Sequence, residues 1–452
     1  MAFPTPALNA CLTHPLPARS YVLFRLGFGL ILGFYFFYAM YSGMLHLQYI
    51  APKFFFTYPG FDWVVRLPGW GMYALYLVLG CLSLLIAIGW FPRIAAGGLC
   101  LGYSYVFLLD VARYQNHIYL ILLLSGIMAI APKLPQGWAG IRARGPSEAQ
   151  IPAWFLYLLR FQVGVVYSFG AIAKWNSDWL FRAEPMATWL VRDIAAPNSW
   201  LHSWQGMPFV ITWGGMLLDL LMVPALLWQK SRPWAVLVAG VFHGTNALLF
   251  NISIFPPLMF WATLLFLHPH WPAQLLARLG WRLGKWGQAE PTRFRLPHWG
   301  LALLAIYSLS QILIPLRHWA YPGDVNWNEA GHRFSWRMKL REKTGSVKLY
   351  WIQDQGTITP LNPEALLDRR QVSKMIHEPF LVHQLCQKLA EGLRQKGVAN
   401  PTIRAVTQVS LNGRPAQPLI ELTANLADEY PMGKGNPWVT SLRPLPQAVR
   451  EP

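Results

Sequence analysis

Nine long stretches of almost purely apolar residues constrain this chain more than any other feature of its sequence. They are Tyr21–Gly43, Gly71–Trp90, Ile94–Leu109, His117–Ala131, Ala153–Ala173, Phe209–Trp228, Trp234–Phe250, Ile254–Leu267 and Trp299–Leu316. An α-helix rises about 1.5 Å per residue, so roughly 20 such residues cross the ~30 Å hydrocarbon core of a bilayer. The third, fourth and eighth runs are shorter, and would have to tilt, recruit polar neighbours or stop short of spanning. We therefore predict a polytopic α-helical membrane protein with about nine transmembrane helices.

Apolar and charged residues are divided unequally along the chain. Most apolar residues precede Leu316, and most charges follow it. Over the whole chain only 13% of residues are charged, against about 25% in a typical soluble protein. We therefore predict a transmembrane helical domain over residues 1–316 and a soluble domain over residues 317–452.

The soluble domain has the patterns of an α+β fold. Apolar and polar residues alternate over Phe334–Arg341, which predicts a strand with one apolar face. The further predicted elements are a turn at Glu342–Ser346, a strand at Val347–Ile352, helices at Pro363–Glu378 and Phe380–Lys396, and strands at Ile403–Leu411 and Pro418–Thr423. Pro379 separates the two helices, and Asn412-Gly413 predicts a hairpin turn between the last two strands.

Basic residues in the predicted loops set the orientation. With the N-terminus inside, the inner loops hold twelve Lys and Arg residues, and the outer loops before the last span hold six. The positive-inside rule then places the N-terminus in the cytoplasm and the C-terminal domain outside it, which is the periplasm in a bacterium. The formal net charge of +18 does not indicate nucleic-acid binding, because basic residues form no run interleaved with aromatics.

Polar residues inside membrane spans are costly, so each is a candidate for a functional or structural role. We interpret Arg25 as a residue that extends its charge toward the interface, because it lies one turn into its span. We assign structural roles to Asp110, Arg160 and Asp219. Asp219 follows a Gly214-Gly215 pair that allows close helix packing, and it needs a polar partner.

His243 and Asn246 are three residues apart and share one helix face. An interhelical hydrogen bond and a ligand site explain this pair equally well. We expect no metal site, because no cluster of His or carboxylate residues with ligand spacing accompanies them.

Lys174 closes one of the apolar runs and permits two readings. It could extend its ammonium group toward lipid headgroups, as lysines at helix ends often do. Alternatively, apolar walls could hold it in a state in which it acts as a base. The predicted topology places Asn116 and His117 at a similar depth on the same side, so helix packing could bring them to Lys174.

Five stretches carry a family resemblance when they are taken together and in order. They are Asp110 with Asn116-His117; Tyr167–Lys174 with Trp175–Trp179; Gly214-Gly215 with Leu217–Asp219; Phe242-His243 with Asn246, Leu249-Phe250 and Phe255; and Asn326-Trp327 with Phe334–Trp336 and Met338. This series resembles the vitamin K-dependent γ-glutamyl carboxylases and the wider bacterial family with a horizontally transferred transmembrane domain.

The resemblance implies an enzyme that oxygenates a reduced vitamin K, phylloquinol or menaquinol, to its epoxide. O2 and CO2 are the co-substrates, and the reaction is coupled to carboxylation of glutamate side chains in a peptide or protein substrate. In this resemblance Lys174 aligns with the initiating base and His117 with a second catalytic residue. It implies contact of Asn116, His243 and Asn246 with the cofactor, and of Ser335 and Trp336 with the substrate.

Two other classes of function compete with the enzyme. One is a non-catalytic membrane protein that binds a quinone or another lipid, and the other is a transporter. A transporter is expected to show inverted repeats and broken helices in matching halves, which this sequence lacks. The enzyme and the lipid-binding protein differ in whether Lys174 shares a pocket with His117 or faces headgroups.

Overall fold

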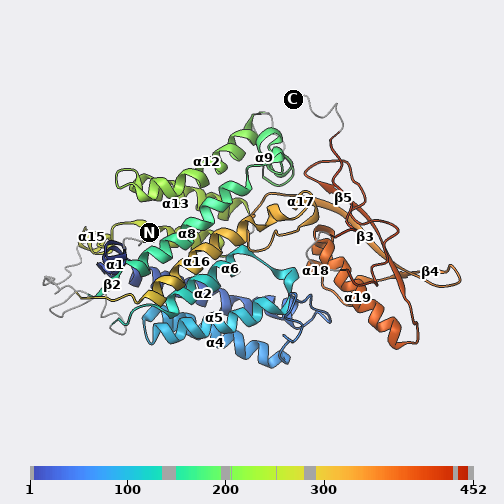
Figure 1. The fold of residues 1–452 in the computed structure, drawn as a ribbon, viewed down its shortest axis with the longest axis horizontal. Coiled ribbons are helices and arrows are strands. Elements are labelled where there is room, and N and C mark those ends of the chain that lie inside the picture. The colour runs from blue at the N-terminus through green and yellow to red at the C-terminus, as the bar shows by residue number, and fades with distance from the viewer. Residues whose placement is uncertain are drawn as a thin grey trace.

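A computed structural model describes residues 5–134, 149–194, 204, 206–250, 252–278, 292–430 and 436–445. A helix bundle forms one part of the molecule, and a smaller domain with a three-stranded sheet lies at one end of it (Figure 1). The main bundle helices are α2 Arg19–Tyr41, α4 Gly69–Ile88, α5 Pro92–Leu109, α6 Asn116–Ala129, α8 Ala153–Ala173, α12 Met207–Leu227, α13 Arg232–Leu249, α14 Phe255–Thr263 and α16 His298–Leu316.

Shorter elements connect or flank these helices. They are α1 Thr5–Thr13, α3 Met44–Tyr49, η1 Val111–Arg113, α9 Ser177–Arg182, α10 Met186–Trp189, the π-helical η2 Leu190–Ile194, η3 Leu264–Phe266, α15 Trp271–Arg278, η4 Arg317–Ala320, α17 Val325–Asn328 and η5 Pro363–Ala365, together with the antiparallel pair β1 Pro15–Pro17 and β2 Gln150–Pro152.

All nine predicted apolar runs form helices. Fewer than nine of these helices, however, are long and apolar enough to count as membrane spans. Within the described residues six helices are long and apolar enough to cross a membrane, namely α2, α4, α5, α8, α12 and the unit His298–Ala320. The helices at Asn116–Ala129 and Phe255–Phe266 are shorter, and α13 does not belong to the six. Nine spans are therefore not established.

Helix α8 is the central element of the bundle. In its most apolar window 72% of residues are buried, compared with 17% in the window of α16. Helices α2 and α4 pack closely because glycines bring their backbones together. A Cβ atom on Gly29 would overlap the carbonyl of Ser83 on the facing helix. Large apolar side chains are exposed on α12 and α16, as contact with lipid requires.

Arg25 is buried, and its predicted extension toward the interface is wrong. Its side chain is 2% exposed and fills the space beside Gly89, where a Cβ atom would overlap the guanidinium group. Arg160 of α8 bonds to the backbone of a neighbouring element. It donates hydrogen bonds of 2.8 and 3.2 Å to the carbonyls of Leu265 and Leu267, and so fixes the end of η3.

The C-terminal sheet has the order β4-β3-β5 and is antiparallel throughout. Its strands are β3 Lys343–Ile352, β4 Ile358–Leu361 and β5 Thr402–Leu411. Helices α18 Arg369–His377 and α19 Pro379–Gln395 pack beside it. Pro379 separates these helices as predicted, although the first begins later than expected, at an Asp368–Gln371 capping box.

Two predicted elements of this domain are wrong. Residues 334–341 form turns and irregular structure, because Phe334, Trp336 and Lys339 have φ values of 62°, 55° and 53°. The alternation of apolar and polar residues in this segment therefore reflects side chains that face different neighbours, and not the two faces of a strand. The turn predicted at Glu342–Ser346 is also absent, because Gly345 lies inside β3. A Cβ atom at Gly345 would overlap the Gln408 carbonyl of β5, so the glycine allows the two strands to come close together.

The predicted turn at Asn412-Gly413 is confirmed. Both residues have positive φ, 50° and 73°, and Val409 and Gln417 exchange two backbone hydrogen bonds across the turn. The chain after the turn makes isolated bridges in place of the predicted strand at Pro418–Thr423.

Two groups of ion pairs and hydrogen bonds are prominent among the polar contacts between the C-terminal domain and the bundle. At one, Asp110 accepts hydrogen bonds from Gln371 at 2.9 Å and from its own loop, while Arg113 forms ion pairs with Asp110 and Asp368. At the other, Asp178 forms a bidentate ion pair with Arg414, at 2.6 Å for both bonds. These contacts fix the position of the domain over the ends of α6 and α8.

Candidate functional site

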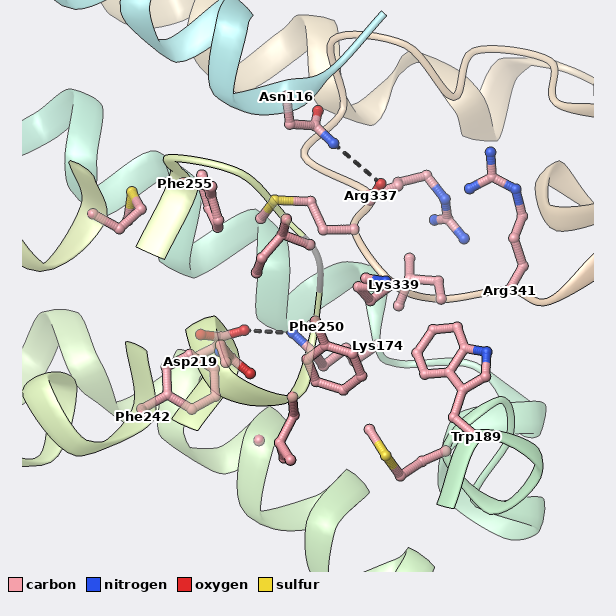
Figure 2. Close-up of a pocket in the computed structure, with 18 of the residues that line it drawn as sticks. Asn116, Lys174, Trp189, Asp219, Phe242, Phe250, Phe255, Arg337, Lys339 and Arg341 are labelled. Carbon is pink, nitrogen blue, oxygen red and sulfur yellow. Dashed lines mark hydrogen bonds and ion pairs between the residues drawn. The ribbon is translucent and has the colours of Figure 1, made fainter. Parts of the chain in front are cut away.

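A cavity of about 670 Å³ lies between the helix bundle and the C-terminal domain. Helices α6, α8, α12, α13 and α14 provide its first wall, with apolar residues such as Val166, Leu218, Phe242 and Met259. Residues 332–342, which we call the cavity loop, provide the second wall together with α18. The cavity is therefore apolar toward the bundle and polar toward the C-terminal domain (Figure 2).

Lys174 lines this cavity at the C-terminal end of α8. Its side chain is buried and forms an ion pair with Asp219 of α12 (Figure 2). Its ammonium group also donates a hydrogen bond of 3.2 Å to the Gly170 carbonyl and lies 5.6 Å from the centre of the Trp179 ring. The lysine therefore faces the protein interior, and Asp219 is its counter-ion.

His117 and Asn116 line the same cavity from the first turn of α6. The His117 imidazole is 6% exposed, and its Nε2 atom has no hydrogen-bond partner among the described residues. Asn116 accepts a hydrogen bond from Tyr114 and donates one of 3.3 Å to the Arg337 carbonyl of the cavity loop. Asn116 thus joins the bundle to the second wall, while His117 keeps a nitrogen available.

His243 and Asn246 line the cavity from α13. His243 is buried, and its Nε2 atom lies 2.7 Å from the hydroxyl of Tyr167, which in turn lies 2.9 Å from the Thr263 hydroxyl. Asn246 is half-buried. The sequence left open an interhelical bond or a ligand site. The structure has the interhelical bond, and it also places both residues at the cavity.

The second wall is strongly basic. The cavity loop presents Arg337, Lys339 and Arg341 (Figure 2). Lys374 of α18 adds a fourth basic side chain, and Glu342 is the acidic residue of this wall. Burial lowers the pKa of Lys374, and the neighbouring Glu378 carboxylate opposes this effect. Burial also lowers the pKa of Arg337, to about 10, so its guanidinium group remains charged at neutral pH. This wall suits a ligand with a carboxylate group.

Two residues assigned to substrate contact lie elsewhere. Trp336 is fully buried and stacks on Tyr119 at a ring distance of 5.1 Å, and Ser335 donates a hydrogen bond to the Gly331 carbonyl. Neither lines the cavity. The cavity is lined instead by the residues that follow them, from Arg337 to Glu342.

Several cavity residues were missed by the sequence reasoning. Tyr167 stands seven residues before Lys174, and this helical spacing could have placed the two on one face. Arg341 and Lys374 carried no such signal, because each becomes a cavity residue only when the C-terminal domain docks on the bundle. In the described ranges no group of three or more His, Cys, Asp or Glu residues could hold a metal ion.

Comparison with known families defines the class of this protein. Residues 13–271, more than half of the chain, match the family described as the HTTM domain. The protein is accordingly a multi-pass membrane protein of the HTTM class. Residues 296–444 match the lumenal domain of the vitamin K-dependent gamma-carboxylase.

The order of these two domains identifies the family. The chain belongs to the vitamin K-dependent γ-carboxylase family, and the resemblance inferred from its motifs is confirmed. The two domains indicate a γ-carboxylase-like function in general terms. No solved structure matches the chain.

Proposed function

We propose that this protein oxygenates a reduced vitamin K or menaquinone to its epoxide and couples this reaction to carboxylation of glutamate side chains. The observation that carries the proposal is that Lys174 and His117 line one cavity with an apolar wall and a basic wall. An apolar wall formed by membrane helices suits a naphthoquinone ring with a prenyl chain. The basic wall suits the carboxylates of a glutamate-containing peptide.

The residues of the apolar wall fit the cofactor. Phe242, Phe255 and Met259 offer surfaces for its rings, and Lys174, His117 and His243 offer polar atoms for its two oxygens. When bound, the reduced quinone supplies, with O2, the strong base that removes a proton from the glutamate γ-carbon. A cavity bounded by protein on both sides keeps water away from that base.

Lys174 and Asp219 accept a proton as a unit. In the ion pair Lys174 already carries its proton, so it cannot take another. If Lys174 Nζ passes that proton to Asp219 Oδ2, the neutral amine can then remove a proton from a ligand hydroxyl. The balance is one proton gained by the pair, which ends as an ammonium group beside a neutral carboxyl group. Asp219 thus has a proton-accepting role beyond helix packing.

The sequence-based topology is part of the proposal. It has nine helices in the membrane over residues 1–316, a cytoplasmic N-terminus and the domain at residues 317–452 outside the cytoplasm. The reporter test is a fusion after residue 452 of an enzyme that is active only in the cytoplasm. A silent reporter supports this orientation, and an active one contradicts it.

The decisive assay uses purified protein with reduced menaquinone or vitamin K and O2, and detects the epoxide. A second measurement adds a glutamate-containing peptide and labelled CO2. Epoxide formation that disappears in Lys174→Ala but persists in Lys53→Ala supports the enzyme, because Lys53 is an exposed lysine that does not line the cavity. Quinone binding without epoxide formation by the unaltered protein would instead support the non-catalytic lipid-binding protein.

A further inference from the structure

Three buried side chains form a hydrogen-bond chain that ends at the cavity. The Thr263 hydroxyl lies 2.8 Å from the Met259 carbonyl, and the Tyr167 hydroxyl lies 2.9 Å from the Thr263 hydroxyl. The same Tyr167 hydroxyl lies 2.7 Å from His243 Nε2. Thr263, Tyr167 and His243 are at most 4% exposed, so water does not compete for these bonds.

The hydrogen bond from the Thr263 hydroxyl to the Met259 carbonyl sets the direction of the other two bonds. A carbonyl oxygen can only accept, so Thr263 spends its single hydroxyl proton on Met259. Thr263 must then accept from Tyr167, which spends the phenolic proton in doing so. Tyr167 can therefore only accept from the imidazole, and the Nε2 atom of His243 carries a proton.

The second nitrogen of His243 is consequently an acceptor. An imidazolium here would be an unpaired charge inside the bundle, which is strongly unfavourable. In the neutral ring with a proton on Nε2, Nδ1 has a lone pair and no proton. Nδ1 is buried, has no hydrogen-bond partner among the described residues, and belongs to an imidazole that lines the cavity. A buried acceptor without a donor is costly, and a ligand hydroxyl would satisfy it.

Tyr167 also links this nitrogen to the site of Lys174. Both residues lie on one face of α8, seven residues apart, which is about 10 Å along the helix axis. That spacing is comparable with the length of a two-ring ligand plus its hydrogen bonds. The acceptor at His243 and the Lys174–Asp219 pair thus bound the same apolar wall of the cavity.

We propose that Thr263 and Tyr167 lock His243 as a hydrogen-bond acceptor, and that this makes the cavity select the reduced form of a quinone over the oxidised form. A hydroquinone presents O–H donors to Nδ1, whereas a quinone presents carbonyl oxygens whose lone pairs would face the lone pair of Nδ1. The inference rests on the proposed quinone site and deepens it, since it names Thr263 and Tyr167 as positioning residues for redox-state recognition.

The test measures binding under anaerobic conditions, so that no turnover is required. The probes are a menaquinol, the matching quinone and the dimethyl ether of the quinol, which has the same shape and no donor. We expect the unaltered protein to bind the quinol about tenfold more tightly than the ether, as one hydrogen bond to a buried acceptor implies. Tyr167→Phe frees the imidazole to adopt either tautomer, so this preference should fall to about twofold or less.

Thr263 gives the sharper variant. In Thr263→Val the Tyr167 hydroxyl proton has no acceptor and can turn to Nε2, which drives the imidazole proton to Nδ1 and removes the preference. Thr263→Ser should restore it. Thr212→Val is the matched control, because Thr212 is also buried in a bundle helix and its hydroxyl also bonds a carbonyl four residues earlier.

The outcomes separate this inference from the proposed function. If Thr263→Val keeps the same preference for the quinol as Thr212→Val, the relay does not set recognition and the inference is wrong. If the unaltered protein binds no form of the quinone, the proposed function fails. The tautomer can then still be read by nitrogen NMR of histidine-labelled protein, where a proton on Nδ1 of His243 would overturn the relay and one on Nε2 would support it.

Discussion

The two walls of the cavity stabilise their charged groups in different ways. In the helix-bundle wall Lys174 has one carboxylate partner, Asp219, and one carbonyl acceptor. In the C-terminal domain the Glu329 carboxylate instead accepts from Arg341 at 2.6 Å and from Lys343 at 2.7 Å, and Lys343 also donates to two carbonyls. When one member of such a network is replaced, the remaining charged groups keep other partners. When one member of an isolated pair is replaced, the other is left without a counter-ion.

This difference explains where a single change should have the largest effect. Charges are more costly in a membrane helix than at a domain surface, so the bundle holds few of them and each has a specific partner. The C-terminal domain holds many, with redundant contacts. We therefore expect function to depend steeply on single residues of the bundle wall and more gradually on residues of the cavity loop and α18.

The largest expected effect is on epoxide formation in variants of Lys174. Removal of a general base typically lowers the rate by about 10²–10⁴-fold. Because Lys174→Ala alone leaves Asp219 buried without a counter-ion, the cleaner variant is Lys174→Ala combined with Asp219→Asn, assayed for epoxide after its folding is verified.

Chemical rescue distinguishes the base from a structural lysine. A small amine added to Lys174→Ala, where Asp219 remains as its counter-ion, should restore part of the epoxide formation, since the missing group only accepts and releases a proton. Unchanged epoxide formation in the Lys174→Ala, Asp219→Asn protein would contradict the mechanism. The exposed Lys53→Ala variant should behave as the unaltered protein does.

The second effect is on stability. Asp219→Ala leaves Lys174 as an uncompensated buried charge, and breaking a buried pair in this way costs about 3–5 kcal/mol. Replacing both partners by apolar residues, as in Lys174→Met with Asp219→Leu, should recover most of that loss but not the activity. Thermal unfolding of the unaltered protein, Lys174→Met, Asp219→Leu and the double variant measures the coupling. A loss in the double variant equal to the sum of the two single losses would show that the pair does not act as a unit.

The third effect is a loss of folding stability at acidic pH, which we expect from the contact of Asp178 with Arg414 between the bundle and the C-terminal domain. Burial alone would raise the pKa of Asp178, but hydrogen bonds from Arg414 and Asn412 and the charges of Arg414 and Arg182 hold it below its usual value. A carboxyl group with a lowered pKa in the folded state stabilises the protein above its unfolded pKa of about 3.9, and this contribution is lost as the pH falls through the folded value.

Asp178→Asn removes this titration while keeping the shape of the side chain. In the unaltered protein the melting temperature should fall as the pH decreases below about 4. In the variant it should be lower at neutral pH and change less on acidification. The same acid dependence in both proteins would mean that other carboxyl groups cause it.

The smallest expected effect is on binding of the glutamate-containing peptide. Lys374→Met removes one of several positive charges from the basic wall. A single partly exposed charge contributes about 0.2–1 kcal/mol, so KM for the peptide should rise by about 1.4- to fivefold while epoxide formation is retained. Lys388→Met on the exposed face of α19 is the control. A KM that does not change would remove Lys374 from the substrate contact.

The cavity loop shows why part of the site could not be predicted. Its alternation of apolar and polar residues is real, yet Phe334, Trp336 and Lys339 adopt positive φ values that no strand permits. Packing of Trp336 on Tyr119 and the hydrogen bond from Asn116 to the Arg337 carbonyl hold this loop in place. Both partners come from α6, more than two hundred residues earlier, so the local pattern could not reveal them.

The sequence by itself determined the features that depend on short stretches of chain. Runs of apolar residues specify helices because an isolated backbone inside a membrane must satisfy its own hydrogen bonds. Asn412-Gly413 specifies a turn because these residues tolerate positive φ, and Pro379 ends a helix because it lacks an amide proton. The five motif stretches, taken together and in order, indicated the family.

Only the tertiary structure decided which polar groups meet. Asp219 is 45 residues from Lys174, and Tyr167 is 76 residues from His243 and 96 from Thr263. Partners at such separations are chosen by how helices pack, which depends on the whole bundle and not on the spacing within one helix. The same holds for Arg25, whose burial follows from the space that Gly89 leaves on another element.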